Sequence, residues 1–375
     1  MENWDVTGKS AIFVGMNGVQ VKNGGRVPYL DLMKGVAIFL VVMGHVIAMC
    51  IRGLDRAFIF KLIEQTHMPI FFFVSGFLTY KAGFRAPNLK KRLLQLIVPM
   101  LVITPLWVWY FPHSGLQSPL SNNLPDLYRS YWKDGYWFPL CLFELFLLYW
   151  PLSQVLARIK SFAGQAVVLV VAYAALIALS LAFSDEAANT DYLGLGLLAR
   201  FFPVFMIGVM ARKAGDAFQQ LLHNPWAISV TMLVTAVALF AMAYPWDALG
   251  DDPAVWSGAA FAIRPVLHLG IAMLVIRLVE PWAASQMPAD ATVRPNAVTR
   301  YFNLLGNESL GIYLLHYFFL FPLTVLQEPL NAMSVQFLPM ALVSALLAVP
   351  ITGITLLLIA LLKHSPLTSR LFLGK

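Results

Sequence analysis

Long apolar runs separated by short polar segments dominate the hydropathy pattern of the chain. Ten of these runs come close to the roughly 20 mostly apolar residues that a helix needs to cross a bilayer. They cover residues 29–50, 59–80, 93–111, 137–156, 163–183, 193–211, 224–244, 258–278, 309–327 and 337–362. The pattern therefore predicts an all-α, polytopic integral membrane protein with about ten transmembrane helices. We expect a tail over residues 1–25, one membrane domain over 26–362 and a second tail over 363–375.

Basic residues gather in alternate loops between these runs, whereas the intervening loops more often carry aspartate and glutamate. The basic set is Lys9, Lys22, Arg26, Lys81, Arg85, Lys90, Lys91, Arg92, Arg158, Lys160, Arg212, Lys213, Arg277, Arg294, Arg300, Lys363, Arg370 and Lys375. Loops rich in lysine and arginine tend to stay in the cytoplasm, so both termini are predicted to be cytoplasmic. An even number of spans agrees with this. The exceptions to the charge rule are Arg52, Arg56, Arg129 and Lys133.

Composition supports a membrane protein. Of the 375 residues, 59% are hydrophobic and only 12% are charged, and the mean hydropathy is +0.72. A soluble domain carries roughly 25% charged residues. The topology-determining cations account for the net charge of +7, so nucleic acid is not expected as a partner. No cleavable signal peptide is recognisable near the start. Cys50 and Cys141 both lie in apolar runs, where two buried thiols are favoured and a disulfide bridge stays the alternative.

Two ionisable groups bracket an uncharged stretch of the first run. The stretch "KGVAIFLVVMGH" begins at Lys34 and ends at His45. Eleven residues of helix rise about 16 Å and turn about three times plus 20°, so both side chains share one face. Gly44, just before His45, permits close approach of another chain or a ligand. This pattern favours a functional histidine in the half of the membrane away from Lys34.

Further ionisable residues lie at a similar depth in later runs. They are His67, Glu144, Arg200, Arg264, His268 and His316, with Tyr313 on the helical stripe of His316. Charged groups so deep in a membrane usually face a bundle interior or a water-filled cavity. We therefore expect one shared polar cavity in which Glu144 pairs with Arg200 or Arg264. The alternative for each group is a structural ion pair or an interhelical hydrogen bond. Trp132 and Trp137 mark either a membrane interface or a carbohydrate platform.

Five segments, in this order along the chain, resemble the membrane acyltransferase family three, the bacterial sugar O-acetyltransferase type. They read "DLMKGVAIFLVVMGH" (31–45), "HMPIFFFVSGFL" (67–78), "WFPLCLFELFLLYWPL" (137–152), "RFFPVFMIGVMARK" (200–213) and "LGNESLGIYLLHYF" (305–318). The second of these is most similar to the fucose acetylase-like branch. Two positions depart from the family pattern. Lys34 stands where arginine is common, and Gln95 ends a motif, begun by Arg92, that commonly closes with arginine.

This resemblance implies a membrane O-acyltransferase, with acetyl the favoured group. It would move the acyl group from cytoplasmic acyl-CoA to a hydroxyl of a lipid-linked or surface glycan sugar. The bacterial inner membrane is the implied location. Acetyl-CoA, or another acyl-CoA, is then a donor substrate rather than a permanently bound cofactor, and no metal site is expected. The implied partners are membrane lipids, the acyl-CoA and the glycan acceptor, and a homo-oligomer stays open.

Acyl transfer to an alcohol requires a base for the hydroxyl proton and donors for the developing oxyanion. The candidate catalytic residues are His45 as general base, His67 in reserve, and Glu144. The candidate ligands of the CoA phosphates are Lys34, Lys90, Lys91 and Arg92. The candidate substrate-binding or cavity residues are Arg200, Arg264, His268, Tyr313 and His316. Direct attack by the acceptor is favoured, and an acyl-histidine intermediate is the alternative.

Two other functional classes compete with an enzyme. A transporter or flippase for a lipid-linked glycan or small solute would also have many spans and charges at the midplane of the membrane. A non-catalytic subunit of a glycan-export complex would tolerate loss of His45. The acceptor sugar is not determined by the sequence.

Overall fold

A computed structural model describes residues 13–14, 20–21, 28–51, 58–81, 84–116, 123–185, 188–243, 253–286, 294–324, 327–332 and 336–375. Most of the predicted tail over residues 1–25, with Lys9 and Lys22, lies outside these described residues. Arg26, Arg52 and Arg56 lie outside them too.

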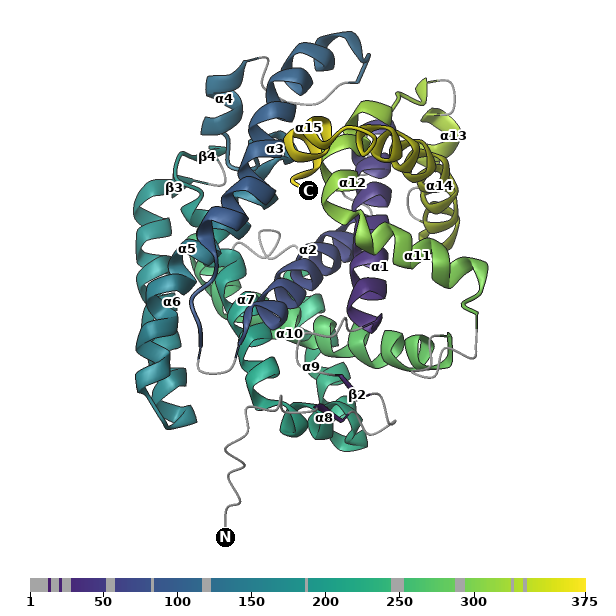
Figure 1. Ribbon diagram of the computed structural model, residues 1–375. Helices are drawn as coiled ribbons and strands as arrows, with labels where there is room; N and C mark the ends of the chain where they lie inside the picture. The colour runs from purple at the N-terminus through teal and green to yellow at the C-terminus, as the bar shows by residue number, and fades with distance from the viewer. Residues whose placement is uncertain are drawn as a thin grey trace.

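Long helices make up most of the fold (Figure 1). They are α1 (Pro28–His45), α2 (Phe58–Thr79), α3 (Leu89–Tyr110), α5 (Trp137–Arg158), α6 (Phe162–Phe183), α7 (Leu195–Ala214), α9 (Pro225–Ala243), α10 (Pro253–Gln286) and α14 (Phe337–Leu362). The shorter α-helices are α4 (Leu124–Arg129), α8 (Asp216–His223), α11 (Ala297–Asn307), α12 (Ser309–Leu315), α13 (Gln327–Ala332) and α15 (Pro366–Thr368).

Single helical turns and two small hairpins complete the secondary structure. The 3₁₀ turns are η2 (Phe111–His113), η3 (Lys133–Gly135) and η5 (His316–Phe319), and the π-helical turns are η1 (Val46–Cys50) and η7 (Ser369–Leu373). The antiparallel hairpins pair β1 (Phe13–Val14) with β2 (Gln20–Val21) and β3 (Ser184–Asp185) with β4 (Thr190–Asp191).

Helix starts follow local capping chemistry. The side chains of Asn88, Ser161 and Asn296 accept hydrogen bonds from backbone N–H groups of the first turns of α3, α6 and α11. Such caps satisfy donors that have no partner inside the helix. They fix where each helix begins, and in α3 this places Lys90 and Lys91 in the first turn.

Within the described residues, 8 helices are long and apolar enough to span a membrane: α1, α3, α5, α6, α7, α9, α10 and α14. This confirms a multi-pass integral membrane protein. The run predicted over 59–80 forms α2, a helix of 22 residues. It is absent from the 8 because the polar stretch Glu64 to His67 lowers its hydropathy.

The prediction of a transmembrane helix over 309–327 is wrong. The apolar helix there covers only Ser309–Phe319. Its last turn, from His316, is 3₁₀, and residues 320–323 have no regular structure. Pro322 cannot donate a backbone hydrogen bond and so opposes continuation of the helix. The Leu323 N–H donates instead to the Cys50 carbonyl, 3.0 Å away, which fixes this segment beside the end of α1.

Helices α1, α2 and α7 form the centre of the bundle. In the most apolar stretches, 67% of the residues of α1 and 78% of those of α7 are buried, against 11% for α6 and for α9. Figure 1 shows α6 at one edge of the bundle and α14 at the opposite side, with α1 and α2 between them. Helices α6 and α9 therefore present apolar side chains to lipid, whereas α1, α2 and α7 carry several of the polar groups, namely His45, His67 and Arg200.

Glycines let the central helices meet backbone to backbone. A Cβ at Gly76 of α2 would lie 1.9 Å from the Phe205 carbonyl oxygen of α7, and one at Gly208 would lie 2.2 Å from the Phe73 oxygen. The crossing of α1 with α11 is equally close at Gly35. Lipid provides little hydrophobic force between helices, so packing of small residues is a main source of their association.

We expect Gly76→Ala to destabilise the protein in detergent. The added methyl would force α2 and α7 apart, and overpacking of this kind costs about 1–3 kcal/mol. The matched control is Gly353→Ala in α14, where nothing lies within 4 Å of the added carbon. Because alanine favours helix over glycine by about 1 kcal/mol, the control should keep or raise the Tm. Equal Tm values for the two variants would contradict a tight α2–α7 crossing.

Among the consecutive long helices, α1 packs against α2, α3 against α5, α6 against α7 and α9 against α10, which is the arrangement expected of antiparallel neighbours. We name the two ends of the bundle by residues of α1. The Lys34 end holds the starts of α1 and α3 and the ends of α2 and α5. The His45 end holds the opposite termini of those helices.

Candidate active site

His45 is the last residue of α1, where the helix widens. The π-helical turn η1 follows immediately, and the Ile51 N–H bonds to the Val46 carbonyl at 3.1 Å. π turns inside helices often mark functional sites. Gly44 lies against Ile63 of α2, whose side-chain carbon would be 3.2 Å from an added Cβ. The local geometry thus holds the imidazole of His45 close to both α2 and the segment after α12.

A chain of hydrogen bonds joins three side chains at the His45 end. His45 Nδ1 lies 3.0 Å from His316 Nε2, and His45 Nε2 lies 2.8 Å from the Tyr317 hydroxyl. His316 Nδ1 is 2.8 Å from the Ile312 carbonyl oxygen. The rings of His45 and His316 are 5.0 Å apart, centre to centre. Residues 271 positions apart in sequence therefore form one continuous network.

The direction of this network follows from its last acceptor. A carbonyl oxygen can only accept, so His316 Nδ1 carries the proton. Nε2 of a neutral His316 is then an acceptor, and His45 Nδ1 must donate to it. In a neutral His45 the remaining nitrogen, Nε2, is left without a proton and accepts from the Tyr317 hydroxyl. The arrangement gives His45 a defined tautomer in which Nε2 is the basic nitrogen.

A tight turn before α5 holds Tyr317 in place. Lys133, Asp134 and Gly135 have φ values of 45°, 50° and 89°, a left-handed run that non-glycine residues rarely adopt. A Cβ at Gly135 would lie 1.9 Å from the Tyr317 oxygen, so only glycine fits there. The Gly135 carbonyl also accepts a hydrogen bond from the Tyr313 hydroxyl. Strained backbone of this kind is typical of functional sites.

Lys133, an exception to the charge rule, stabilises this turn. Its ammonium donates to the carbonyls of Tyr128, Ser130 and Asp191 at 3.1, 3.3 and 2.8 Å. The Asp191 carboxylate accepts from the N–H groups of Leu195 and Gly196 at the start of α7, both at 2.9 Å. Burial lowers the pKa of Lys133 and raises the pKa of Asp191. Lys133 is thus a structural cation rather than a topology signal.

A cavity of about 480 Å³ opens in front of His45. Its predicted members are His45, His67, Arg200 and His268, and Trp132, Trp137 and Tyr317 also line it. Glu64 and Asp134 contribute carboxylates. The volume falls in the range of about 300–1,000 Å³ that suits small-molecule sites. The structure therefore brings together part of the polar set expected from the sequence.

One wall of the cavity, formed by α7, α10 and the start of α5 with the segment before it, combines the Arg200 cation and the His268 ring with flat aromatic rings. The Arg200 guanidinium lies 5.1 Å from the centre of the Trp132 ring. The His268 ring stacks on Phe201, with centres 5.9 Å apart, and Phe201 in turn stacks on Trp137 at 5.2 Å. His268 is 2% exposed, and its Nδ1 has no hydrogen-bond partner among the described residues. This wall offers both a stacking surface and polar atoms to a bound molecule.

The predicted pairing of Glu144 with Arg200 or Arg264 is wrong. Glu144 lies beside the start of α7, where a Cβ at Gly194 would be 2.7 Å from its Oε2. That oxygen is buried without a hydrogen-bond partner among the described residues, and Lys133 is the cation whose charge acts on the carboxyl group. Gly194 precedes Arg200 by about 9 Å of helix, so Glu144 lies nearer the His45 end of the bundle than Arg200 does. Glu144 therefore lies against the turn before α7 and does not line the cavity.

Three other predicted cavity residues do not line the cavity: Arg264, Tyr313 and His316. His316 lies behind His45 and is fully buried. Tyr313 bonds to Gly135 and is 3% exposed. Arg264 acts electrostatically on His268 from α10. The expectation that all the predicted polar residues share one cavity is therefore wrong for Arg264, Tyr313 and His316. His316 and Tyr313 instead contact residues that line the cavity, His45 and Gly135.

The four cations proposed for the donor do not form a single cluster. Lys34 pairs with Asp31 at 2.7 Å. The Arg92 guanidinium lies over the Phe146 ring of α5, 4.5 Å from its centre. Lys90 and Lys91 line a different pocket, against the C-terminal segment. Successive residues of a helix point in different directions, which separates Arg92 from its two neighbours.

The family follows from a comparison of the whole chain. A family model described as "Acyltransferase domain" matches residues 27–362. The chain belongs to acyltransferase family 3. It is therefore a membrane acyltransferase, an enzyme class that transfers acyl groups between a donor and an acceptor. The sequence resemblance to this family is confirmed.

Two relatives give shorter matches to this family 3 chain. The Nodulation protein NolL of Sinorhizobium fredii is 32% identical over 114 residues, which are 27% of this chain and 31% of the relative. The Nodulation protein NolL of Mesorhizobium japonicum gives the same figures. The match spans about a third of the length of these curated relatives. No solved structure matches the chain.

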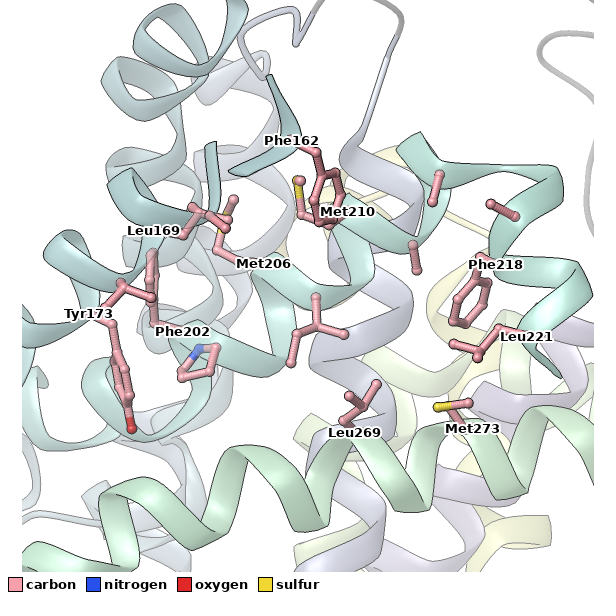
Figure 2. A pocket seen from close by; sticks show the side chains of 17 residues that line it. Phe162, Leu169, Tyr173, Phe202, Met206, Met210, Phe218, Leu221, Leu269 and Met273 are labelled. Atoms are coloured by element: carbon pink, nitrogen blue, oxygen red, sulfur yellow. The ribbon is translucent and has the colours of Figure 1, made fainter. Parts of the chain in front are cut away.

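A second, apolar pocket of about 520 Å³ lies among α6, α7, α8 and α10 of this acyltransferase. Figure 2 shows Phe202, Met206, Met210 and Leu269 among the side chains around it. The one hydroxyl that lines it, on Tyr173, already donates to the Phe261 carbonyl at 2.6 Å. No lining residue is a candidate base, so this pocket does not suit acyl transfer.

Sequence reasoning missed Tyr317 and Gly135 in this acyltransferase. A signal for Tyr317 existed, because it directly follows His316 and lies four residues after Tyr313. Gly135 gave only the general signal of a glycine in a turn. The two cysteines, whose pairing was left open, are both free and buried.

Proposed function

We propose that this acyltransferase moves an acetyl group from acetyl-CoA to a hydroxyl of a lipid-linked or surface glycan sugar, with His45 as general base. The observation that carries the proposal is the hydrogen-bond chain that leaves His45 Nε2 unprotonated at the cavity. His67 lines the same cavity and is the reserve base. Glu144 is not proposed for catalysis, since it lies outside the cavity.

The chemistry needs one proton acceptor and one thioester. His45 Nε2 takes the proton of the acceptor hydroxyl as its oxygen attacks the thioester carbonyl. The carbon–sulfur bond then breaks, and the imidazolium returns the proton to the leaving thiolate. The Tyr317 hydroxyl donates to His45 Nε2 before the reaction, and it would turn from Nε2 to the oxyanion when Nε2 takes the proton of the acceptor. Transfer through an acyl-histidine is the alternative route.

The acceptor would occupy the wall of Arg200, His268 and Trp132. Sugar hydroxyls both donate and accept, so they suit His268 Nδ1 in either tautomer. Flat rings such as Trp132 and Trp137 give an apolar surface for the face of a sugar. The donor would enter from the opposite end of the bundle. At that end Arg92 lies against α5 and Lys34 pairs with Asp31 of its own helix, and we propose both cations for the CoA phosphates.

The decisive test is turnover. Purified protein in lipid vesicles, supplied with labelled acetyl-CoA and candidate glycans, should release CoA and acetylate the glycan. Mass spectrometry of surface glycans from cells with and without the protein should differ by one acetyl group per modified sugar. Transport of an unmodified glycan without CoA release would instead establish the transporter alternative.

Orientation is a part of this proposal that can be tested directly. Basic loops place the Lys34 end in the cytoplasm. A cysteine at the exposed Asp185 should therefore react with a membrane-impermeant maleimide applied to intact cells, and a cysteine at the exposed Lys90 should not. The native Cys50 and Cys141 are buried, so background labelling should be low. Labelling at position 90 but not at 185 would reverse the orientation.

A further inference from the structure

A pocket of about 620 Å³ lies at the Lys34 end, between the start of α3 and the C-terminal segment α15–η7. Its lining residues are of two kinds. We call the basic ones the rim, Lys90, Lys91, Arg370 and Lys375, and the apolar ones the floor, Leu94, Val98, Leu367 and Leu371. No aspartate or glutamate is among its described lining residues. The pocket is unrelated to the cavity of His45, with which it shares no residue.

The C-terminal segment that supplies half of this pocket is anchored. Gly374 has φ 66° and packs so closely that a Cβ would lie 2.3 Å from the Gln95 carbonyl oxygen of α3. The Lys375 ammonium bonds to Glu308 Oε2 at 2.8 Å and to the Asn307 carbonyl at 3.0 Å. These contacts place Arg370 opposite Lys90 and Lys91 in a fixed groove.

The cations around the C-terminal segment fall into two groups, one with a carboxylate partner and one without. Glu308 neutralises Lys363 and Lys375, at 2.5 and 2.8 Å. In contrast, no described residue forms an ion pair or a hydrogen bond with the side chain of Lys90, Lys91 or Arg370. Three cations therefore converge on a pocket without a counter-ion from this part of the chain.

The floor of the pocket continues onto the outer surface of the bundle. Leu94 is 50% exposed and Leu367 is 65% exposed. Further along α3, Leu101 and Leu106 are exposed on the same helix. In a membrane-spanning helix, such side chains meet lipid chains. A ligand that places an anionic head at the cations and apolar chains over the leucines would match both halves.

We propose that this pocket binds the head group of an anionic phospholipid. Its phosphate would contact Lys90, Lys91 and Arg370, and its acyl chains would lie over Leu94 and Leu367. Basic pockets next to transmembrane helices attract anionic lipids with about 1 kcal/mol for each lysine or arginine. The three cations without counter-ions and the exposed apolar floor favour a lipid over the water-soluble CoA at this place.

Lipid retention by purified protein tests the proposal. The protein is solubilised, incubated with equal amounts of phosphatidylglycerol and phosphatidylcholine, and examined by native mass spectrometry. Wild type should retain phosphatidylglycerol preferentially. Arg370→Gln should weaken retention about fivefold and Lys90→Gln with Lys91→Gln about 25-fold, from the charge contributions above. The control, Arg158→Gln, removes an exposed arginine at the same end but outside the pocket and should behave as wild type.

Two results would overturn the lipid assignment. The first is phosphatidylglycerol retention that is equal in wild type, Arg370→Gln and the double lysine variant. The second is unchanged lipid retention together with weakened binding of free CoA in those variants, which would assign the pocket to the donor. Neither result depends on turnover, so failure of the proposed acetyl transfer would leave this test intact. Retention should also fall with added salt, because exposed charges are screened.

Discussion

His45→Ala should lower acetyl transfer by about 10²–10⁴-fold, the usual contribution of a general base. The effect should appear in kcat, since the base acts in the transition state and adds little to substrate binding. Removal of the ring also leaves the Tyr317 hydroxyl and His316 Nε2 without their observed partner. A buried polar group without a partner costs about 1–3 kcal/mol, so the variant needs a companion that keeps a hydrogen bond.

His45→Gln is that companion. A glutamine side chain can still accept from Tyr317 but is not basic at any working pH. Both variants should be nearly inactive, while His45→Gln should keep a Tm close to that of wild type. His364→Ala is the control, because His364 is exposed and, among the described residues, its ring bonds only to the Ala360 carbonyl near the end of α14. Initial rates of CoA release at matched protein amounts give the comparison.

His67→Ala separates the two candidate bases. His67 lines the same cavity but its Nδ1 is already bonded to the Ile63 carbonyl within α2. We expect only a moderate loss in this variant. Near-normal turnover in both His45 variants, with a large loss in His67→Ala, would transfer the role of base to His67. Normal turnover in all three variants would refute the catalytic role of this cavity.

The relation of Lys34 to His45 could be predicted because it is local. Helical rise and turn fix two residues of one helix relative to each other, whatever packs around them. The meeting of His67, Arg200 and His268 with His45 in one cavity could be predicted too. Each side chain lies on a different helix, and its distance from the ends of its apolar run indicates its level along the bundle.

Rotation of helices about their own axes could not be predicted. Glu144 faces the turn before α7 rather than the cavity, because rotation depends on packing between helices rather than on hydropathy. The bond between His45 and His316 joins residues 271 positions apart and depends on where the short helix α12 stops. Apolarity alone predicted a full span there, whereas Pro322 and the 3₁₀ turn at His316 end the helix early.

Lys133 illustrates the same limit for charge. As a basic residue in a loop that was expected to be poor in cations, Lys133 is an exception to the charge pattern that predicts topology. Its ammonium instead satisfies three backbone carbonyls around a left-handed turn. That turn brings Gly135 against the Tyr317 hydroxyl, and so a segment before α5 shapes the site. A single sequence gives no signal for such a long-range contact.

His316→Leu should lower kcat by about 10–100-fold, the loss that is usual when the partner that orients a metal-bound histidine is removed. His316 does not line the cavity, so it acts as a positioning residue through His45. Without an acceptor at position 316, the His45 ring keeps its bonds to the Val41 carbonyl and the Tyr317 hydroxyl, but the preference for the tautomer that presents a basic Nε2 to the acceptor sugar weakens. KM for acetyl-CoA and for the glycan should stay close to that of wild type.

Rescue by His316→Gln distinguishes orientation from packing. The glutamine amide oxygen can replace the imidazole Nε2 as acceptor for His45 Nδ1–H, whereas leucine, which also fills the buried space, cannot. We therefore expect most of the lost kcat to return in His316→Gln, at similar Tm for both variants. The Ile312 carbonyl remains satisfied in each variant by the backbone N–H of residue 316. Equal loss of activity in the leucine and glutamine variants, or a loss confined to KM, would show that His316 does not set the tautomer of His45.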